Sequence, residues 1–302
     1  MNRPEMFRCS YRRCRCMVSV NPGGQDFGMK TSKPGLRQIR ARVRFGLVVL
    51  LMLAACFGRA SAQTDCADGN GILDMAPPKD MTPDALIQKF TAAENKVKEA
   101  RGHYTYTQDV MVQTLDDKTV DGQFHEITTV SYDDKGKRLE SVTFAEQPTL
   151  RGINLSETDM DDIRVFMPWI LTSDSVAQYK LTYAGQQHVD DLDTYVFHVE
   201  PKSEEKNKRY FQGRIWVDNR DFEIVKLCGK TVPEQIHAKK NQPQEVRPMF
   251  VAYRQLLDGY WFPAYARVDD TLHFRAESVH VREIVKFKDY KRTGATSTAS
   301  KP

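Results

Sequence analysis

Apolar and polar residues alternate at every second position in run after run of this chain, and short polar turns separate the runs. From His103 onward the runs are rich in β-branched and aromatic residues, as in HYTYTQDVMVQT and RIWVDNRDFEIVK. A period of two is typical of β-strands, and tight turns such as Asp258-Gly259 join neighbouring strands into antiparallel hairpins. Three such strands precede residue 155 and roughly seven follow it. This pattern predicts one large antiparallel sheet.

Two helices are expected beside the sheet. Thr82 is a suitable N-cap for the first, and Gly102 ends it. The second follows Ser156, which forms a capping-box pattern with Asp159, and Pro168 must kink or end it. The order of helix, three strands, helix and remaining strands predicts an α+β fold with the helices gathered on one side of the sheet.

The basic character of the chain is confined to its first 62 residues. Lys and Arg number 44 in the whole chain and Asp and Glu number 40, but residues 1–62 hold twelve of the former and two of the latter. The rest is therefore acidic, which disfavours nucleic acid as a partner. Residues 30–44 are basic and residues 45–57 are apolar, as in a secretory signal peptide, and the apolar run is too short for an ordinary membrane span.

Two processing sites are compatible with export. Ala60-Ser61-Ala62 fits cleavage before Gln63, which gives a soluble periplasmic protein. The stretch Leu53–Cys56 resembles a bacterial lipobox, in which Cys56 becomes lipidated and tethers the protein to a membrane. We favour cleavage after Ala62. Met29 is an alternative start, in which case the preceding 28 residues are not translated.

The remaining chain divides into a tether (residues 63–81), a single domain (residues 82–290) and a Ser/Thr-rich tail (residues 291–302) expected to be disordered. About 240 exported residues are enough for one sizeable core. Cys66 and Cys228 are the cysteines of this part, and export permits a disulfide. Because Cys66 lies in a polar lead-in and Cys228 in a strand pattern, we expect them not to pair.

Motifs of catalytic and metal sites are missing from the sequence. It contains no HExxH, no Gly-x-Ser-x-Gly elbow, and no glycine-rich phosphate or dinucleotide loop. The acidic run Asp159–Asp162 lacks the glycine and the distal glutamate of a calcium loop, and acidic residues also suit the first turn of a helix. We therefore expect a protein that is not an enzyme and that needs no cofactor.

Several strands carry bulky apolar residues on both faces, as in Phe124 with Ile127 and Phe211 with Trp216. Two helices are few for a sheet of this size, so a hydrophobic ligand site is predicted, with core packing as the alternative for any single aromatic. The candidate cavity residues are Tyr106, Phe124, Phe166, Met167, Trp169, Ile170, Trp216, Ile224 and Tyr265.

Two hairpins resemble those of a known superfamily. RIWVDNRDFEIVK is similar to a hairpin of the periplasmic outer membrane lipoprotein carrier (LolA-like) superfamily, and LDGYWFPAYARV looks like the Asp-Gly-x-x-x-Pro hairpin of its lipoprotein-sorting relatives. The order of elements over residues 82–290 also matches. The resemblance implies a half-barrel, a curved sheet whose concave side is covered by helices and holds acyl chains, without catalytic residues. The long loop at residues 232–248 departs from a minimal carrier.

The leading hypothesis is an exported protein that binds an acyl chain or another elongated apolar ligand, and the resemblance implies lipoprotein or lipid handling as its role. We expect residues 160–171 to form a lid over the concave side, with Phe166, Met167, Trp169 and Ile170 facing the cavity. The alternative is an envelope sensor or interaction protein that binds a polypeptide through residues 232–248 and the edge strands. The resemblance permits this, since relatives of the fold include stress regulators. Membrane association is expected only if Cys56 is lipidated.

Overall fold

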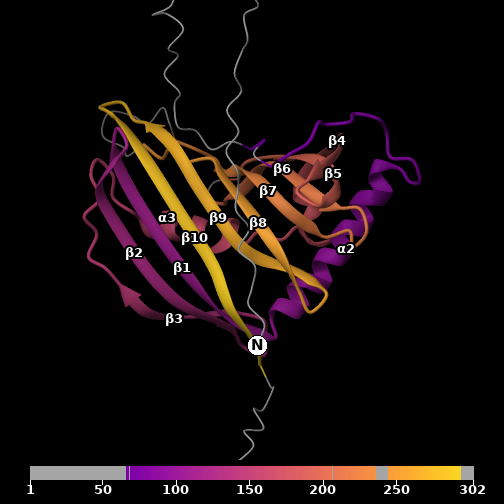
Figure 1. The fold of residues 1–302 in the computed structure, drawn as a ribbon, viewed down its shortest axis with the longest axis horizontal. Coiled ribbons are helices and arrows are strands. Elements are labelled where there is room, and N and C mark those ends of the chain that lie inside the picture. Colours follow the sequence, from indigo (N-terminus) through magenta and orange to yellow (C-terminus); the bar gives the residue numbers. More distant parts are fainter. Residues whose placement is uncertain (1–65, 68, 206, 236–243, 294–302) are drawn as a thin grey trace, which may run out of the picture. The chain divides into compact units, whose positions relative to one another are not determined.

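The computed structural model describes residues 66–67, 69–205, 207–235 and 244–293. Within them, ten strands form one antiparallel sheet in the order β3-β2-β1-β10-β9-β8-β7-β6-β5-β4 (Figure 1). The strands are β1 (Tyr104–Asp116), β2 (Thr119–Tyr132), β3 (Arg138–Ala145), β4 (Tyr179–Val189), β5 (Leu192–Pro201), β6 (Tyr210–Asp218), β7 (Ile224–Val232), β8 (Phe250–Leu257), β9 (Tyr260–His273) and β10 (Ser278–Arg292). The predicted α+β class with a large curved antiparallel sheet is confirmed, as is the division into three strands and seven.

Two meanders are joined along the pairing of β1 with β10. This pairing runs from Tyr104 opposite Arg292 to Leu115 opposite His280. It leaves β3 and β4 at the two edges of the sheet. Residues 146–178, here called the crossing segment, connect these edges. The face that they cover together with the first helix is called the inner face.

The helical elements begin where the capping residues indicate. Helix α2 (Pro83–Arg101) starts after Thr82, whose side chain accepts a hydrogen bond from the Ala85 amide at 3.2 Å, and Gly102 ends it. Helix α3 (Glu157–Asp161) has the expected capping box and continues as a π-helical turn, η1 (Asp162–Phe166). The helical part thus stops before Pro168 and is shorter than the expected lid. A short 3-10 helix, η2 (Val176–Gln178), leads into β4.

The hairpin from β8 to β9 follows its sequence signal closely. Asp258 and Gly259 have φ values of 51° and 83°, the left-handed conformation that a two-residue turn of this kind requires. Trp261 and Phe262 belong to clusters on opposite faces of the sheet. The strand register shifts next to Pro263, because proline cannot donate a ladder hydrogen bond and is accommodated in sheets at bulges and edges.

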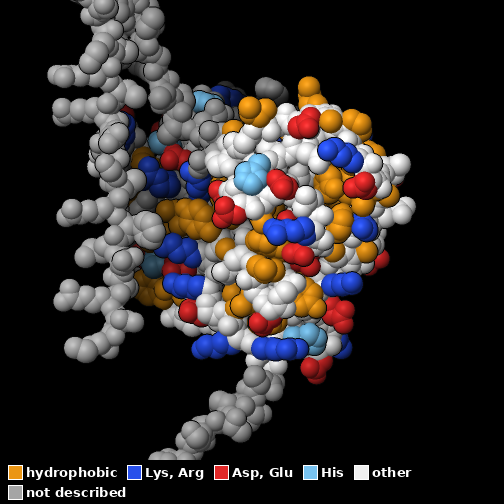
Figure 2. All heavy atoms as spheres, turned by 45° about the vertical axis from the view of Figure 1, so that its right-hand side comes forward, with side chains coloured by type: hydrophobic (Ala, Val, Ile, Leu, Met, Phe, Trp, Pro, Cys, Tyr) orange, Lys and Arg blue, Asp and Glu red, His pale blue; other side chains and the backbone are white. Residues whose placement is uncertain are grey.

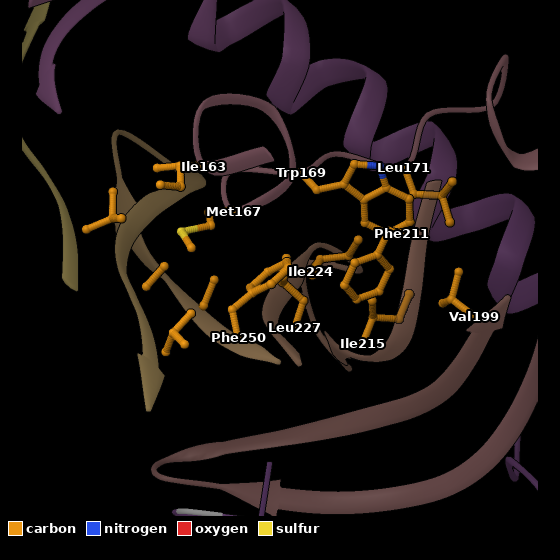
Figure 3. Close-up of a cluster of buried hydrophobic side chains, with 14 of the residues drawn as sticks. Ile163, Met167, Trp169, Leu171, Val199, Phe211, Ile215, Ile224, Leu227 and Phe250 are labelled. Atoms are coloured by element: carbon orange, nitrogen blue, oxygen red, sulfur yellow. The ribbon is translucent and has the colours of Figure 1, made fainter. Parts of the chain in front are cut away.

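The inner face holds the largest buried cluster. Phe90 of α2 packs on Phe197 of β5, with 5.4 Å between ring centroids. Figure 3 shows Trp169 of the crossing segment beside Phe211 of β6, and Met167 farther along the same layer. The helices and the crossing segment therefore fill much of this face by ordinary core packing.

The outer face carries a second cluster, covered by residues 66–76. Single bridges pair Asn70 with Val189 and Asp74 with Gln186 at the β4 edge. A disulfide joins Cys66 to Cys228, with 5.6 Å between their Cα atoms. The expectation that these cysteines stay unpaired is wrong. β7 is buried on both faces, and the polar segment that precedes α2 covers its outer face. Cys66 therefore lies over Cys228.

Charged side chains of both signs are interspersed with apolar areas over the face of the molecule drawn in Figure 2. Across the residues that the structure describes, no helix combines the length and the apolar character needed to cross a membrane. β10 continues to Arg292, so residues 291 and 292 belong to the sheet and not to the predicted tail; residues 294–302, like the leader and Cys56, lie outside the described residues.

Candidate ligand-binding cavity

A cavity of about 480 Å³ lies between the inner face, the crossing segment and the stretch that leads into β8. This volume falls within the range of small-molecule sites in proteins. Its apolar lining comes from three parts of the chain that are far apart in sequence. The apolar residues are Ile153, Leu155, Ile163, Met167, Val246, Phe250, Leu272, Phe274 and Val281.

Charged residues gather at one end of the cavity. Arg247, which is almost fully buried, donates to Asp159 and lies 3.2 Å from Asp162. Arg209 donates to Asp162 at 2.8 Å from just outside the lining, and Thr231 donates to the same carboxylate oxygen at 2.8 Å. These contacts hold α3 and η1 against the strands. The residues at the polar end of the cavity therefore also fix the position of the segment that forms its wall.

Glu283 lies at the same end of the cavity but takes part in none of these ion pairs. It lies in β10 opposite Val112 of β1 and Val268 of β9, and its side chain is 7 % exposed. No hydrogen bond or ion pair connects its carboxyl group to any residue that the structure describes. Burial raises the pKa of Glu283 to about 8, and the carboxylates of Asp159 and Asp162 add to the effect while Arg247 opposes it. Glu283 is therefore mostly protonated at neutral pH.

The neighbouring groups are also incompletely satisfied. Burial raises the pKa of Asp162, although Arg209 and Arg247 act in the opposite direction. Oδ1 of Asp162 and the Nε atoms of both arginines are buried without a hydrogen-bond partner among the described residues. Buried polar atoms usually find partners in folded proteins, so these three atoms mark the polar end of the cavity as incompletely paired within the described residues. Among the described residues, no group of three or more His, Cys, Asp and Glu is placed to hold a metal ion.

Of the predicted site residues, only Met167 lines this cavity. Trp169 packs on Phe211 and Tyr179 instead, at centroid distances of 4.6 and 5.4 Å. Phe166, its neighbour in the crossing segment, is partly buried against the inner cluster. Ile170 packs with a small cluster at the far end of α2.

The predicted residues of the strands divide between the two faces. Tyr106, Phe124 and Ile224 belong to the inner cluster but do not line the cavity. Trp216 is fully buried in the outer cluster. Tyr265 pairs with Tyr253, which packs against that same outer cluster, and residues directly opposite each other share a face.

Sequence reasoning missed Glu283, although a signal for it exists. In β10 the inward positions are occupied by Val279, Val281, Glu283, Val285 and Phe287. A carboxylic acid in the middle of an otherwise apolar alternation is a departure that periodicity alone can detect.

Comparisons with known proteins add the following. No family model matches the sequence, and no curated protein is significantly similar to it. The chain is similar in structure to a DUF1329 family protein from Desulfovibrio piger, at 12% identity and TM-score 0.38 over 70% of this chain and 95% of that one. It is similar to a LolA superfamily protein from Nitrosomonas europaea, at 13% identity and TM-score 0.31 over 66% and 91%.

A third similar structure is MucB in complex with MucA(peri), at 10% identity and TM-score 0.20 over 70% of this chain and 99% of that one. A LolA superfamily protein is thus among the structures that the chain resembles, as the two hairpins led us to expect.

Proposed function

We propose that this protein is an exported, non-catalytic binding protein that holds an elongated apolar ligand, such as an acyl chain, in the cavity behind the crossing segment. The observation that carries the proposal is the cavity of about 480 Å³ with an apolar lining from three parts of the chain. Apolar side chains that line a partly open pocket of this size forgo dispersion contacts and stay in contact with water, and a bound apolar chain recovers both contributions to the free energy.

Two features support export. The first 62 residues carry the pattern of a signal peptide, and a disulfide joins Cys66 to Cys228. Disulfides persist in oxidising compartments such as the bacterial periplasm. Intact mass of the protein purified from the envelope distinguishes the two products: a chain that begins at Gln63 is soluble, and a diacylated chain that begins at Cys56 is membrane-tethered.

Binding of straight-chain alcohols tests the cavity directly. Isothermal titration with alcohols of increasing length is expected to show affinity rising about fourfold per added methylene, from roughly 0.8 kcal/mol for each buried CH₂, until the cavity is full. Native mass spectrometry of gently purified protein is expected to show a co-purified apolar molecule. A ligand-free protein that binds no alcohol at any length contradicts the proposal.

A matched pair of variants locates the binding. Ile153 is a partly exposed lining residue, so Ile153→Trp fills the cavity without replacing a core residue. Val165 lies in the same crossing segment, is 52% exposed and does not line the cavity. The affinity for the alcohols is expected to fall by a factor of about ten or more in Ile153→Trp and to stay unchanged in Val165→Trp. Equal binding by both variants would place the ligand elsewhere.

A second candidate function, binding of a polypeptide, is favoured by the edge strand β3. Its residues Val142 and Phe144 are 52% and 47% exposed, and β3 ends the sheet within the described residues. An exposed edge offers unpaired backbone groups to an added strand. Val142→Lys is expected to abolish capture of such a partner in a pull-down while alcohol binding stays unchanged; capture that survives this change removes β3 from consideration.

A further inference from the structure

The polar end of the cavity contains more negative than positive charge. Glu245 lies 3.2 Å from Arg247 and 3.6 Å from Arg209, the same two guanidinium groups that pair with Asp159 and Asp162. Among the described residues three carboxylates thus share two cations, and one negative charge stays unbalanced before Glu283 is considered. Ionisation of Glu283 adds a second.

Within the part of the chain that the structure describes, no element around Glu283 supplies the missing positive charge. Its partners across β1 and β9 are Val112 and Val268, and its neighbours along the inward side of β10 are Val281 and Val285. The charged groups that face it from the other side are Asp159 of α3, Asp162 of η1, and Glu245 and Arg247 of the stretch before β8, with Arg209 behind Asp162. Both terminal nitrogens of Arg247 are already paired, Nη1 with Asp159 and Asp162 and Nη2 with Glu245.

We propose that the ligand of this cavity is a cationic amphiphile, whose protonated amine pairs with the Glu283 carboxylate while its hydrocarbon chain occupies the apolar part. The proposal rests on the proposed function, because it names the chemical class of the ligand held at that same site. An ammonium group supplies the charge that the lining lacks and offers N–H donors to a carboxylate that has no partner. A carboxylate or phosphate headgroup would add to the negative excess.

Binding of the amine is coupled to loss of a proton. In the empty protein Glu283 is mostly protonated, so an ammonium ion that pairs with its carboxylate displaces that proton to solvent. The cost of ionisation is small because the pKa of Glu283, about 8, is close to neutral pH. Pairing with the ammonium group offsets this cost, because each charge then has a partner in a surrounding where an unpaired charge is unfavourable.

Three probes of equal chain length test the proposal: decylamine, 1-decanol and decanoic acid, titrated calorimetrically into the purified protein at pH 7. Decylamine is expected to bind about tenfold more tightly than decanol, and decanoate more weakly than either. Titrations in two buffers of different ionisation enthalpy are expected to show release of about one proton per bound amine and none with decanol.

Variants assign the effect to Glu283. Glu283→Gln keeps the shape of the side chain but cannot ionise, so the preference for decylamine over decanol and the proton release are expected to disappear while decanol still binds. The control is Glu223→Gln, which changes a second buried carboxyl, with a pKa of about 7, that does not line the cavity. This variant is expected to keep both the preference and the proton release.

Each other outcome overturns the proposal. Equal affinity for decylamine and decanol without proton release would show that Glu283 acts as a neutral hydrogen-bond donor to an uncharged headgroup. Tightest binding of decanoate would show that the arginines, not the acidic groups, select the ligand. Undiminished amine preference in Glu283→Gln would move the cationic site elsewhere. Failure of all three probes to bind would overturn the proposed function itself, and this inference with it.

Discussion

A buried ion pair between Glu94 of α2 and Arg254 of β8 fastens the helix and the crossing segment to the inner face. Arg254 donates to both carboxylate oxygens of Glu94, at 2.8 and 2.9 Å, and to the carbonyl of Trp169 at 2.6 Å. Glu94 also accepts from the Ile224 amide at 3.0 Å and is completely inaccessible to solvent. One charge pair thus connects α2, the crossing segment, β7 and β8.

Removing one partner of this pair is expected to cost far more stability than removing both. Arg254→Met leaves the buried carboxylate of Glu94 without its cation, and Glu94→Gln leaves the buried guanidinium without its anion, each at about 3–5 kcal/mol. In the double variant both charges are gone, and Gln at position 94 still offers an oxygen to the Ile224 amide. The remaining loss is mainly the donor to the Trp169 carbonyl, about 1–3 kcal/mol.

Urea denaturation of the four proteins at one pH measures this cycle. The sum of the stability losses in the two single variants is expected to exceed the loss in the double variant by at least about 3 kcal/mol. The slope of unfolding free energy against urea should stay constant, which shows that the compactness of the folded state is unchanged. Single losses below roughly 1 kcal/mol that add up in the double variant would refute the reasoning, since the pair would then behave as if solvent-exposed.

Three further predictions concern the core, the disulfide and pH. Trp169→Ala is expected to cost about 3–5 kcal/mol of stability by urea denaturation, while decanol affinity, measured by calorimetry, stays unchanged because the indole packs on Phe211 and does not line the cavity. Replacement of Cys66 and Cys228 by Ser is expected to cost about 2–5 kcal/mol, seen as a lower midpoint in the same assay. The unfolded chain loses the proton of Glu283 above the ordinary pKa of 4.5, whereas the folded protein keeps it up to a pKa of about 8. The free energy of unfolding therefore falls as the pH rises from 4.5 to about 8. Glu283→Gln should remove this part of the pH dependence and stabilise the protein by about 3 kcal/mol at pH 7, and a variant with the wild-type pH profile would contradict the assignment.

Local signals in the sequence predicted the elements well because each has a local physical cause. The Thr82 cap, the capping box at Ser156 and the turn at Asp258 depend on hydrogen bonds or backbone conformations within a few residues. The register shift beside Pro263 follows from a missing amide donor. These features are independent of the tertiary structure, so sequence alone can locate them.

The candidate site was predicted poorly because alternation sorts residues by face without saying which face is the inner one. Phe211 and Trp216 were correctly placed on opposite faces, but Trp216 was assigned to the cavity, whereas Phe211 is the one that packs under the crossing segment. Tyr265 was assigned to the inner face for the same reason and lies on the outer one. A shift of one residue exchanges the two faces of a strand, and nothing local distinguishes them.

The disulfide and the outer cover depend on contacts between segments far apart in sequence. Cys66 and Cys228 are separated by 162 residues, and their approach requires residues 66–76 to run along the β4 edge. The close approach occurs at Gly185, where a Cβ atom would lie 2.3 Å from the carbonyl oxygen of Asp74. Composition described the lead-in as polar, which is true, but polar residues can also cover an apolar face through their backbone and aliphatic parts.

Glu283 decides whether the cavity is a packing defect or a site. A valine or leucine at that position would continue the inward stripe of Val279, Val281 and Val285, remove the cost of burying a carboxyl, and leave an apolar gap that accepts any hydrocarbon equally. With glutamate the same gap has two chemically different ends, an apolar one formed by the crossing segment and the strands and an acidic one short of positive charge. Hydrocarbon burial supplies affinity without regard to headgroup, whereas a buried ionisable group penalises every ligand that fails to complement it. The proposed site would therefore distinguish among amphiphiles of the same length through a single residue, and the stability that Glu283 costs the empty protein is the measurable consequence of that arrangement.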